Sequence, residues 1–295
     1  MLNPSASEVA YTCLGVEHDL RSDGRGRLDF RCIEVECGVV KQSNGSARIT
    51  LGAGGTAVLA SVKVEVAEPA RERPGQGFLH VNVECNPSVS PKFERRAASN
   101  LNAELTQTLD TLLARSGFLE DNSVLLSIVA GAACWSIFLD VTVMDYDGNL
   151  TDAVALAAYV ALRDTLIPSL TLVDTEGGGK DYELDADAAA GRALCMDKVP
   201  LCVTLSRIGE DERLFVADAS FDEDFCARSR VAVAVNRLGA VCGVTKLGAG
   251  SVDMAVMQKM LQTASHLGAQ LFLTTDTVLG RIGAGEHNAS DVEDA

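Results

Sequence analysis

Two groups of aspartates have the side-chain type and the close spacing that a divalent-cation site needs. The first group is Asp145, Asp147 and Asp152, and the second is Asp181, Asp185 and Asp187. Their carboxylate oxygens are ligands that Mg²⁺ accepts. However, residues 147–149 (Asp-Gly-Asn) are also ordinary turn chemistry, Asp152 is a good helix N-cap, and the second group is typical of a solvated loop. We therefore interpret both groups as structural and predict no metal or other cofactor.

Two glycine-rich turns could bind an anion through successive backbone N–H groups. Residues 52–56 (Gly-Ala-Gly-Gly-Thr) lack the Gly-Lys-Ser/Thr ending of a phosphate-binding loop and lead into a strand, so they predict a strand-to-strand turn. Residues 248–251 (Gly-Ala-Gly-Ser) open a helix, whose N-terminus attracts anions, but a helix entry with no ligand is the better interpretation.

Positive charge gathers in two short stretches of a strongly acidic chain. The stretches contain Arg21, Arg25, Arg27 and Arg31, and then Lys92, Arg95 and Arg96. These cations could contact phosphates, or they could form salt bridges on a solvated surface, and the sequence favours neither. No aromatic residues alternate with them, so stacking on single-stranded bases is not supported. With 25 Lys plus Arg against 41 Asp plus Glu, and a net charge of −16, the chain alone does not resemble a nucleic-acid-binding protein.

The composition is that of a folded protein in a reducing compartment. Apolar residues make up 47% of the 295, which excludes global disorder and provides a large core. The nine cysteines form no Cys-x-x-Cys pair and the four histidines do not cluster with them, which argues against disulfides and structural zinc. The N-terminus lacks the features of a secretory signal, and the longest helical apolar run, residues 153–162, is too short to span a membrane.

The first part of the chain is expected to form an antiparallel sheet followed by helices and further strands. Alternating apolar residues predict strands over residues 32–39, 48–51, 56–66, 78–85, 124–129 and 135–144. Leucines or alanines at helical spacing predict helices over about 102–115 and 153–166. Gly117 would end the first helix, and Thr151 or Asp152 would cap the second.

The second part repeats this arrangement after a polar, glycine-rich loop at residues 174–181. Extended segments are expected over residues 201–208, 214–217, 231–235 and 241–246. A last helix with a continuous apolar stripe follows, with Ser251 as its N-cap. Runs of strands separated by helices, without strict alternation, indicate an α+β fold with mixed sheets.

The order of several short motifs resembles that of the RNase PH-like proteins, and within them one branch of RNA exosome ring subunits. The motifs are residues 20–25 (LRSDGR), 46–52 (SARITLG), 93–94 (FE), 139–141 (LDV), 145–153 (DYDGNLTDA), 199–200 (VP) and 246–251 (KLGAGS). Each motif is short, but their order and spacing are specific, and the resemblance covers about residues 15–275. It implies an RNase PH fold, in which two similar β-α lobes of the ribosomal protein S5 domain 2 type carry helices on mixed or antiparallel sheets.

The resemblance also implies an assembly. Such subunits pack with other RNase PH-like subunits into a hexameric ring, carry S1/KH cap subunits, and enclose a channel for single-stranded RNA, with no membrane involved. They serve ribosomal RNA maturation, RNA surveillance and turnover in the nucleus, including the nucleolus, and in the cytoplasm. The corresponding division of this chain is an N-terminal arm (1–19), an N-terminal lobe (20–190), a C-terminal lobe (191–275) and a disordered acidic tail (276–295).

The chain departs from active family members where the chemistry would occur. Active members degrade RNA from its 3′ end with phosphate as the nucleophile, and they need a phosphate-binding turn of Gly-Gly-Thr-Arg type beside a pair of carboxylates. This chain has Gly-Asn-Leu-Thr-Asp at 148–152, where Leu150 supplies no hydrogen-bond donor and the charge of Asp152 would repel phosphate.

The carboxylate positions fall on Ala186 and Arg192, although Asp185 and Asp187 lie close enough for a small gap to restore one of them.

The RNA-binding arginines of archaeal relatives would fall near Thr111 and Ala114, with only Arg115 adjacent. We therefore predict a non-catalytic structural subunit of the exosome ring that has no catalytic residues, and we expect Arg95, Arg96 and Arg115 to contact RNA. The alternative is an active phosphate-dependent 3′–5′ exoribonuclease, alone or through a composite site with a ring neighbour. A third interpretation is an unrelated α+β protein that shares only short turns.

Overall fold

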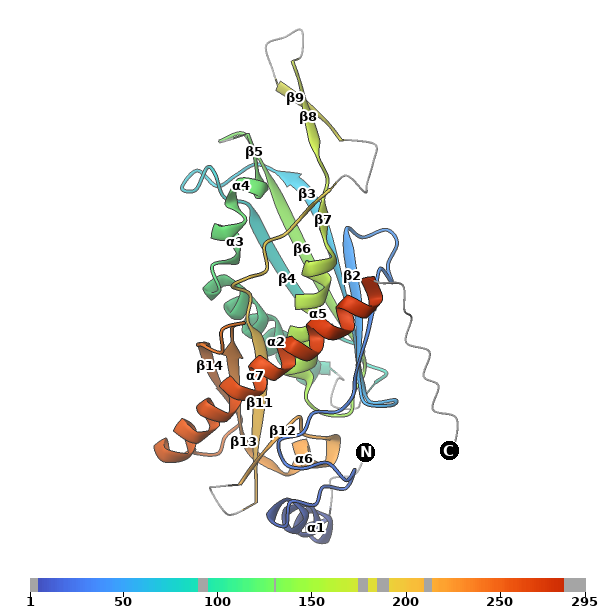
Figure 1. Cartoon of the computed structure of the whole chain (residues 1–295), viewed down its shortest axis with the longest axis vertical. Helices are drawn as coiled ribbons and strands as arrows, with labels where there is room; N and C mark the ends of the chain where they lie inside the picture. The colour runs from blue at the N-terminus through green and yellow to red at the C-terminus, as the bar shows by residue number, and fades with distance from the viewer. Residues whose placement is uncertain are drawn as a thin grey trace.

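The body of the molecule consists of two β-sheets with a buried helix between them (Figure 1). The computed structural model describes residues 5–89, 95–129, 131–174, 180–184, 191–209 and 214–283. The larger sheet comes from the first half of the chain and the smaller from the second. The expected α+β fold with mixed sheets and packed helices is confirmed.

The larger sheet has the strand order β1-β2-β3-β6-β4, with the short β5 also paired to β6. Its strands are β1 Ile33–Cys37, β2 Gly45–Leu51, β3 Thr56–Ala67, β4 Phe78–Cys85, β5 Ser127–Val129 and β6 Ala133–Asp145. In β3 the alternating residues Val58, Ala60 and Val62 are fully buried, as the pattern predicts. The glycine-rich segment 52–56 joins β2 to β3, so the predicted strand-to-strand turn is confirmed.

One strand of this sheet contradicts the expected antiparallel arrangement. β4 runs parallel to β6, with Phe78 opposite Ser136 and Cys85 opposite Val143. A hairpin cannot connect parallel neighbours, so the chain crosses over through helices. The crossover contains α2 Arg95–Arg115, α3 Phe118–Asp121 and α4 Ser123–Leu126. Residues 124–126, expected as part of a strand, therefore belong to α4.

Helix α2 covers the free edge of β4. It begins at Arg95, earlier than the predicted Asn102. The backbone N–H of Val83 donates to Thr106 Oγ1 at 3.1 Å, and that of Cys85 donates to Asn102 Oδ1 at 3.2 Å. These side chains satisfy donors that an uncovered edge strand would present to another chain.

Helix α5 (Leu150–Asp164) lies between the two sheets. It contacts β2 and β3 on one side and β11 of the smaller sheet on the other. All residues from 153 to 162 are buried, as expected for a helix that is apolar all round. The helix follows Asn149, which has a left-handed backbone conformation with φ 52°. Thr151 and Asp152 lie inside the first turn, so the prediction that one of them is the N-cap is wrong.

The smaller sheet has the order β12-β11-β13-β14, with every neighbouring pair antiparallel. Its strands are β11 Leu201–Ile208, β12 Phe215–Ala217, β13 Ala227–Val235 and β14 Val241–Leu247. The four predicted segments are confirmed, with shifts of a few residues at their ends. The short helix α6 (Phe221–Cys226), which the sequence analysis did not predict, connects β12 to β13.

Helix α7 (Met254–Gly283) packs on β11 and β13 and runs diagonally across the body in Figure 1. The predicted apolar stripe is buried at Val256, Met260, Ala264, Leu267 and Leu271. The helix begins three residues after Ser251, which is therefore not its N-cap. Residues 276–283, assigned to a disordered tail, continue the helix, and residues 284–295 lie outside the described part of the chain.

Within the N-terminal arm, residues 6–17 form α1 (Ala6–Glu17). A capping box starts it: the Ser5 N–H donates to Glu8 Oε2 at 2.6 Å, and the Glu8 N–H donates to Ser5 Oγ at 3.3 Å. α1 contacts α6, and Val16 is its one buried residue.

Two small antiparallel pairs complete the described structure. They are β7 Leu166–Ile167 with β10 Arg192–Ala193, and β8 Leu170–Asp174 with β9 Lys180–Leu184. The β8–β9 ribbon projects from the body at the top of Figure 1. Among the helices described, none has the length and apolar character needed to cross a membrane.

Candidate functional site

A small cavity lies beside residues 148–152, where the resemblance places the phosphate-binding turn. Its volume is about 140 Å³, and α2, the start of α5, β11 and β13 contribute to its wall. The residues that decide its chemistry are Leu101, Glu104, Tyr146, Leu150, Asp224 and Arg230. This cavity is the candidate site against which the predicted loss of catalysis can be judged.

The loop that leads into the cavity is held by backbone contacts. Thr56 Oγ1 donates to the carbonyl of Gly148 at 2.6 Å and accepts the N–H of Asp147 at 2.9 Å. Gly148 has φ +85°, and a Cβ there would lie 2.3 Å from the carbonyl oxygen of Ala219. Only glycine allows this conformation and this approach without strain, so the loop lies directly against the second half of the chain.

Asp152 does not line the cavity. Its carboxylate is fully buried and accepts hydrogen bonds from the Thr204 N–H (2.8 Å), the Thr204 hydroxyl (2.6 Å) and the Asn149 amide (3.1 Å). Burial raises the pKa of Asp152 to about 6, outweighing these donors. The expectation that its charge faces bound phosphate is therefore wrong, because the side chain joins α5 to β11 instead.

Three of the ionisable groups that line the cavity are paired with one another, and its neutral polar lining comes from Thr108, Asn149, Thr151, Thr204 and Ser206. Arg230 Nη1 contacts Asp224 Oδ1 at 2.8 Å, and the Tyr146 hydroxyl donates to Asp224 Oδ2 at 2.8 Å. Burial and the charge of Asp224 raise the pKa of Tyr146, so its hydroxyl stays protonated. Among the described lining residues Arg230 is the one cation, and Glu104 adds a further negative charge. Such a lining does not favour an anion.

The cations of the N-terminal stretch form ion pairs with the second half of the chain. Arg21 donates to both carboxylate oxygens of Glu223, at 2.8 and 2.6 Å, and both side chains are almost fully buried. Arg31 donates to both oxygens of Asp218, at 2.9 and 2.8 Å.

Arg25 donates to Asp218 Oδ2 at 2.9 Å, and Arg27 pairs with Asp19 at 3.0 Å. Of the two interpretations of this stretch, salt bridges are confirmed, although the main ones are buried and long-range rather than superficial and local.

Asp218 is the centre of this network. It accepts hydrogen bonds from Arg25 and Arg31, and from the Asn149 amide at 2.8 Å. Burial alone would raise the pKa of Asp218, but the hydrogen bonds and charge of Arg31 hold it below its ordinary value. Asn149 therefore connects two buried carboxylates, Asp152 in α5 and Asp218 directly after β12 of the smaller sheet.

The structure describes the first aspartate group and only part of the second. Asp147 Oδ2 pairs with Arg31 at 3.2 Å, while Asp152 is buried elsewhere. In the described part of the chain, no cluster of three or more His, Cys, Asp or Glu could hold a metal ion. Asp181 lies on β9 with its side chain not described, and residues 185–190, which include Asp185, Ala186 and Asp187, lie outside the described residues.

The residues expected to contact RNA lie on α2. Arg115 is exposed at its C-terminal end, where it lines a small cavity with Thr111 and residues of β13 and β14. Arg95 and Arg96 begin the helix, with side chains that are not described. The structure therefore puts these three residues on one helix but does not bring them together at one site.

Comparison with known proteins identifies the family to which this chain belongs. The model described as "3' exoribonuclease family, domain 1" (RNase PH) matches residues 29–168, and that of domain 2 matches residues 198–266. A Dictyostelium discoideum protein named "Putative exosome complex exonuclease RRP42" is 30% identical over an alignment of 321 positions, which covers 94% of this chain and 98% of that protein. This chain belongs to the RNase PH family of 3′ exoribonucleases.

Other RNase PH family members agree with this assignment. The "Exosome complex component Rrp42" of Methanothermobacter thermautotrophicus is 31% identical and covers 91% of this chain and 93% of its own length. A chain of the Archaeoglobus fulgidus exosome with RNA bound to the active site is 28% identical with a TM-score of 0.74, covering 91% of this chain and 97% of that one. An archaeal exosome core chain at 24% identity and TM-score 0.70, covering 92% and 96%, shows the same fold.

The residues that join the two sheets of this RNase PH fold were not predictable from the sequence patterns. Ser220 and Glu223 have the Ser-x-x-Glu spacing of a capping box, which could have revealed α6. Nothing in the local sequence marks Asp218 or Thr204, because their partners lie far away along the chain.

The buried Asp152 predicts a pH dependence of stability. Its pKa rises from an ordinary 3.8 to about 6 on folding, so the folded protein binds this proton more tightly. The resulting stabilisation is complete below about pH 4 and is lost as the pH rises through 6, a change of roughly 3 kcal/mol. Asp152→Asn should remove this component, as measured by urea unfolding at a series of pH values. If the difference in free energy of unfolding between the wild type and Asp152→Asn stayed constant from pH 4 to pH 7, the prediction would be contradicted.

Proposed function

We propose that this chain is a non-catalytic structural subunit of the RNA exosome ring, supporting 3′-to-5′ RNA processing and degradation. The observation that carries the proposal is the lining of the cavity beside residues 148–152. Leu150 supplies no donor there, and the one described cation, Arg230, is already paired with Asp224. The names of the relatives, exosome components over nearly their whole length, support the assembly.

In this proposal the chain assembles with other RNase PH-like subunits in a hexameric ring that carries S1/KH cap subunits. The ring works in ribosomal RNA maturation and RNA turnover, in the nucleus, its nucleolus and the cytoplasm. Single-stranded RNA passes through the assembled channel, and this chain contributes Arg95, Arg96 and Arg115 of α2 to phosphate contacts. The acidic balance of the chain fits RNA affinity that belongs to the assembly rather than to the isolated subunit.

The decisive experiment measures phosphorolysis. The purified chain, incubated with poly(A), phosphate and Mg²⁺, is expected to release no nucleoside diphosphate, while the ring reconstituted with its neighbours contains the chain stoichiometrically. Release by the chain alone that disappears in an Asp185→Asn, Asp187→Asn double variant would establish an active exoribonuclease instead. Release that appears only with a ring neighbour and is lost in the same variant would establish a composite site.

The RNA contact is tested at Arg115. In the reconstituted ring, Arg115→Glu should weaken binding of single-stranded RNA by about three- to tenfold and reduce the salt dependence of binding by roughly one ion. Arg71→Glu makes the same charge change at an exposed residue of the β3–β4 connection and is the matched control. Binding is measured by fluorescence anisotropy with labelled RNA. If both variants weakened binding equally, the cause would be a general effect of charge rather than a contact by Arg115.

A further inference from the structure

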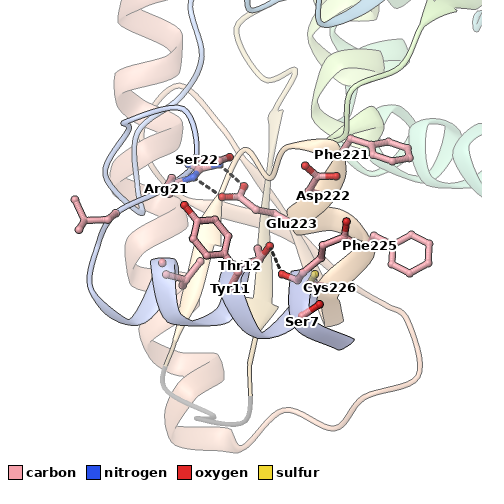
Figure 2. Close-up of a pocket in the computed structure, with 14 residues that line it drawn as sticks. Ser7, Tyr11, Thr12, Arg21, Ser22, Phe221, Asp222, Glu223, Phe225 and Cys226 are labelled. Carbon is pink, nitrogen blue, oxygen red and sulfur yellow. Dashed lines mark hydrogen bonds and ion pairs between the residues drawn. The ribbon is translucent and has the colours of Figure 1, made fainter. Parts of the chain in front are cut away.

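A larger cleft, which shares α6 with the cavity at residues 148–152, lies between α1 and α6 (Figure 2). Its volume is about 580 Å³. The side chain of Tyr11 rises from α1 toward the Arg21–Glu223 ion pair, which lies at the α6 side of the cleft. A concavity of this size is sufficient for one or two large side chains of a partner.

The walls of this cleft leave large apolar side chains in water. Tyr11 is 73% exposed and Leu20 is 70% exposed, and both line it. Phe221 and Phe225 of α6 also line it, with rings that point away from Tyr11 in Figure 2. The Phe221 ring packs edge-on against Tyr146, with 5.6 Å between the ring centroids. Clustered apolar surface around a concavity is typical of an interaction site, whereas a single exposed apolar residue is not.

The charge at the mouth of the cleft is negative. Glu8 on α1 and Asp222 on α6 are both exposed lining residues. Arg21 is the one basic residue in the described lining, but its side chain is 0% exposed and its guanidinium is paired with Glu223. The mouth therefore presents carboxylates to a partner and no accessible cation from the described residues.

Helix α1 gains little from the rest of the fold. Val16 is its single buried residue, and Tyr11, which lines the cleft, is 73% exposed. Helices as short as α1 are marginal in water unless an apolar face is packed. Contact with a partner in the cleft would supply that packing.

We propose that the cleft between α1 and α6 binds a basic segment of another protein, which places a large apolar side chain beside Tyr11 and pairs lysine or arginine with Glu8 and Asp222. Complementary charge argues for this occupant and against three others. The chain's own residues after Arg281 contain four acidic residues and no Lys or Arg. A second copy carries the same net charge of −16, and nucleic acid would be repelled by the carboxylates.

This proposal does not depend on exosome membership, so it is tested on the purified full-length chain. The probe is a fluorescein-labelled synthetic peptide of lysine, leucine and tryptophan, and its counterpart has glutamate in place of lysine. The basic peptide should bind with an affinity that falls as sodium chloride rises, and the acidic peptide should not bind. Tyr11→Ala and the double variant Glu8→Gln, Asp222→Asn should each weaken binding about tenfold. Glutamine at position 8 preserves the capping box.

Two variants on the same helix are the controls. Leu14→Ala removes an exposed apolar side chain, and Glu17→Gln removes one charge, and neither residue lines the cleft. Both should leave the affinity within about twofold of the wild type. The proposal would be overturned if the basic peptide did not bind, or if the acidic peptide bound equally well. It would also be overturned if the control variants weakened binding as much as the cleft variants. Protection of α1 and α6 amides from hydrogen exchange by the basic peptide would support it.

Discussion

Replacing Arg21 with alanine is expected to lower the free energy of unfolding by about 3–5 kcal/mol. The substitution leaves Glu223 as an unpaired buried charge, since its side chain is only 3% exposed and Arg21 supplies donors to both of its oxygens. It also removes donors from the carbonyls of Ala217 and Asp218, which Arg21 contacts at 3.1 and 2.8 Å. Urea unfolding followed by circular dichroism measures the change.

Two further variants identify the cause of this loss. Arg27→Ala removes an arginine of the same segment whose partner, Asp19, is exposed, and it should change the unfolding midpoint far less. The double variant Arg21→Met, Glu223→Leu replaces the buried pair with apolar groups and should recover much of the lost stability, because no uncompensated charge remains. A double variant as unstable as Arg21→Ala would show that the ion pair is not the main cause, and would assign the loss to the carbonyl contacts of Arg21 together with the Ser220 N–H that Glu223 accepts at 2.9 Å.

Replacing Gly148 with alanine is expected to destabilise the protein by about 2–5 kcal/mol. The residue has φ +85°, and the added Cβ would lie 2.3 Å from Ala219 O and 2.7 Å from the carbonyl carbon of Ser220. These atoms are backbone, so the loop before α5 must move away from the second half of the chain.

The Gly38→Ala variant separates the cost of the left-handed backbone conformation from the cost of the steric clash. Gly38 also has a positive φ, of +67°, but a Cβ there meets nothing within 4 Å. This variant should cost only the roughly 1–2 kcal/mol of the left-handed conformation. Thermal unfolding of both variants in parallel measures the difference, and equal losses would mean that the contact with residues 219 and 220 relaxes freely.

Secondary structure was predictable wherever buried apolar residues recur with the period of a strand or of a helix. The alternation in β3 and the apolar stripe of α7 follow directly from which residues face the core, whereas β11 is buried along its whole length. Strand partners were not predictable in the same way. β4 has a good strand pattern, but its parallel pairing with β6 depends on a crossover through α2 that periodicity does not encode.

The chemistry of the site was only partly predictable. Leu150 faces the cavity, as its place in the degenerate turn suggests. The sequence suggests two roles for Asp152, a helix cap and a charge facing phosphate, and both are wrong because its carboxylate is bound by Thr204 of β11. The arginines of the N-terminal stretch likewise pair with distant carboxylates. Arg31 and Asp218 are 187 positions apart in the chain, and Arg21 and Glu223 are 202 positions apart. Such contacts depend on tertiary structure, and no local pattern specifies them.

The position of α5 between the sheets has a consequence for biosynthesis. A ribosome releases α5 before β11 and β13, so a nascent chain that has completed the larger sheet still exposes the opposite side of this apolar helix. Burial of that side must wait until the smaller sheet emerges, and during this interval the intermediate is prone to aggregation. We therefore expect the two halves to mature together rather than in turn, and the first half expressed alone to leave one side of α5 exposed.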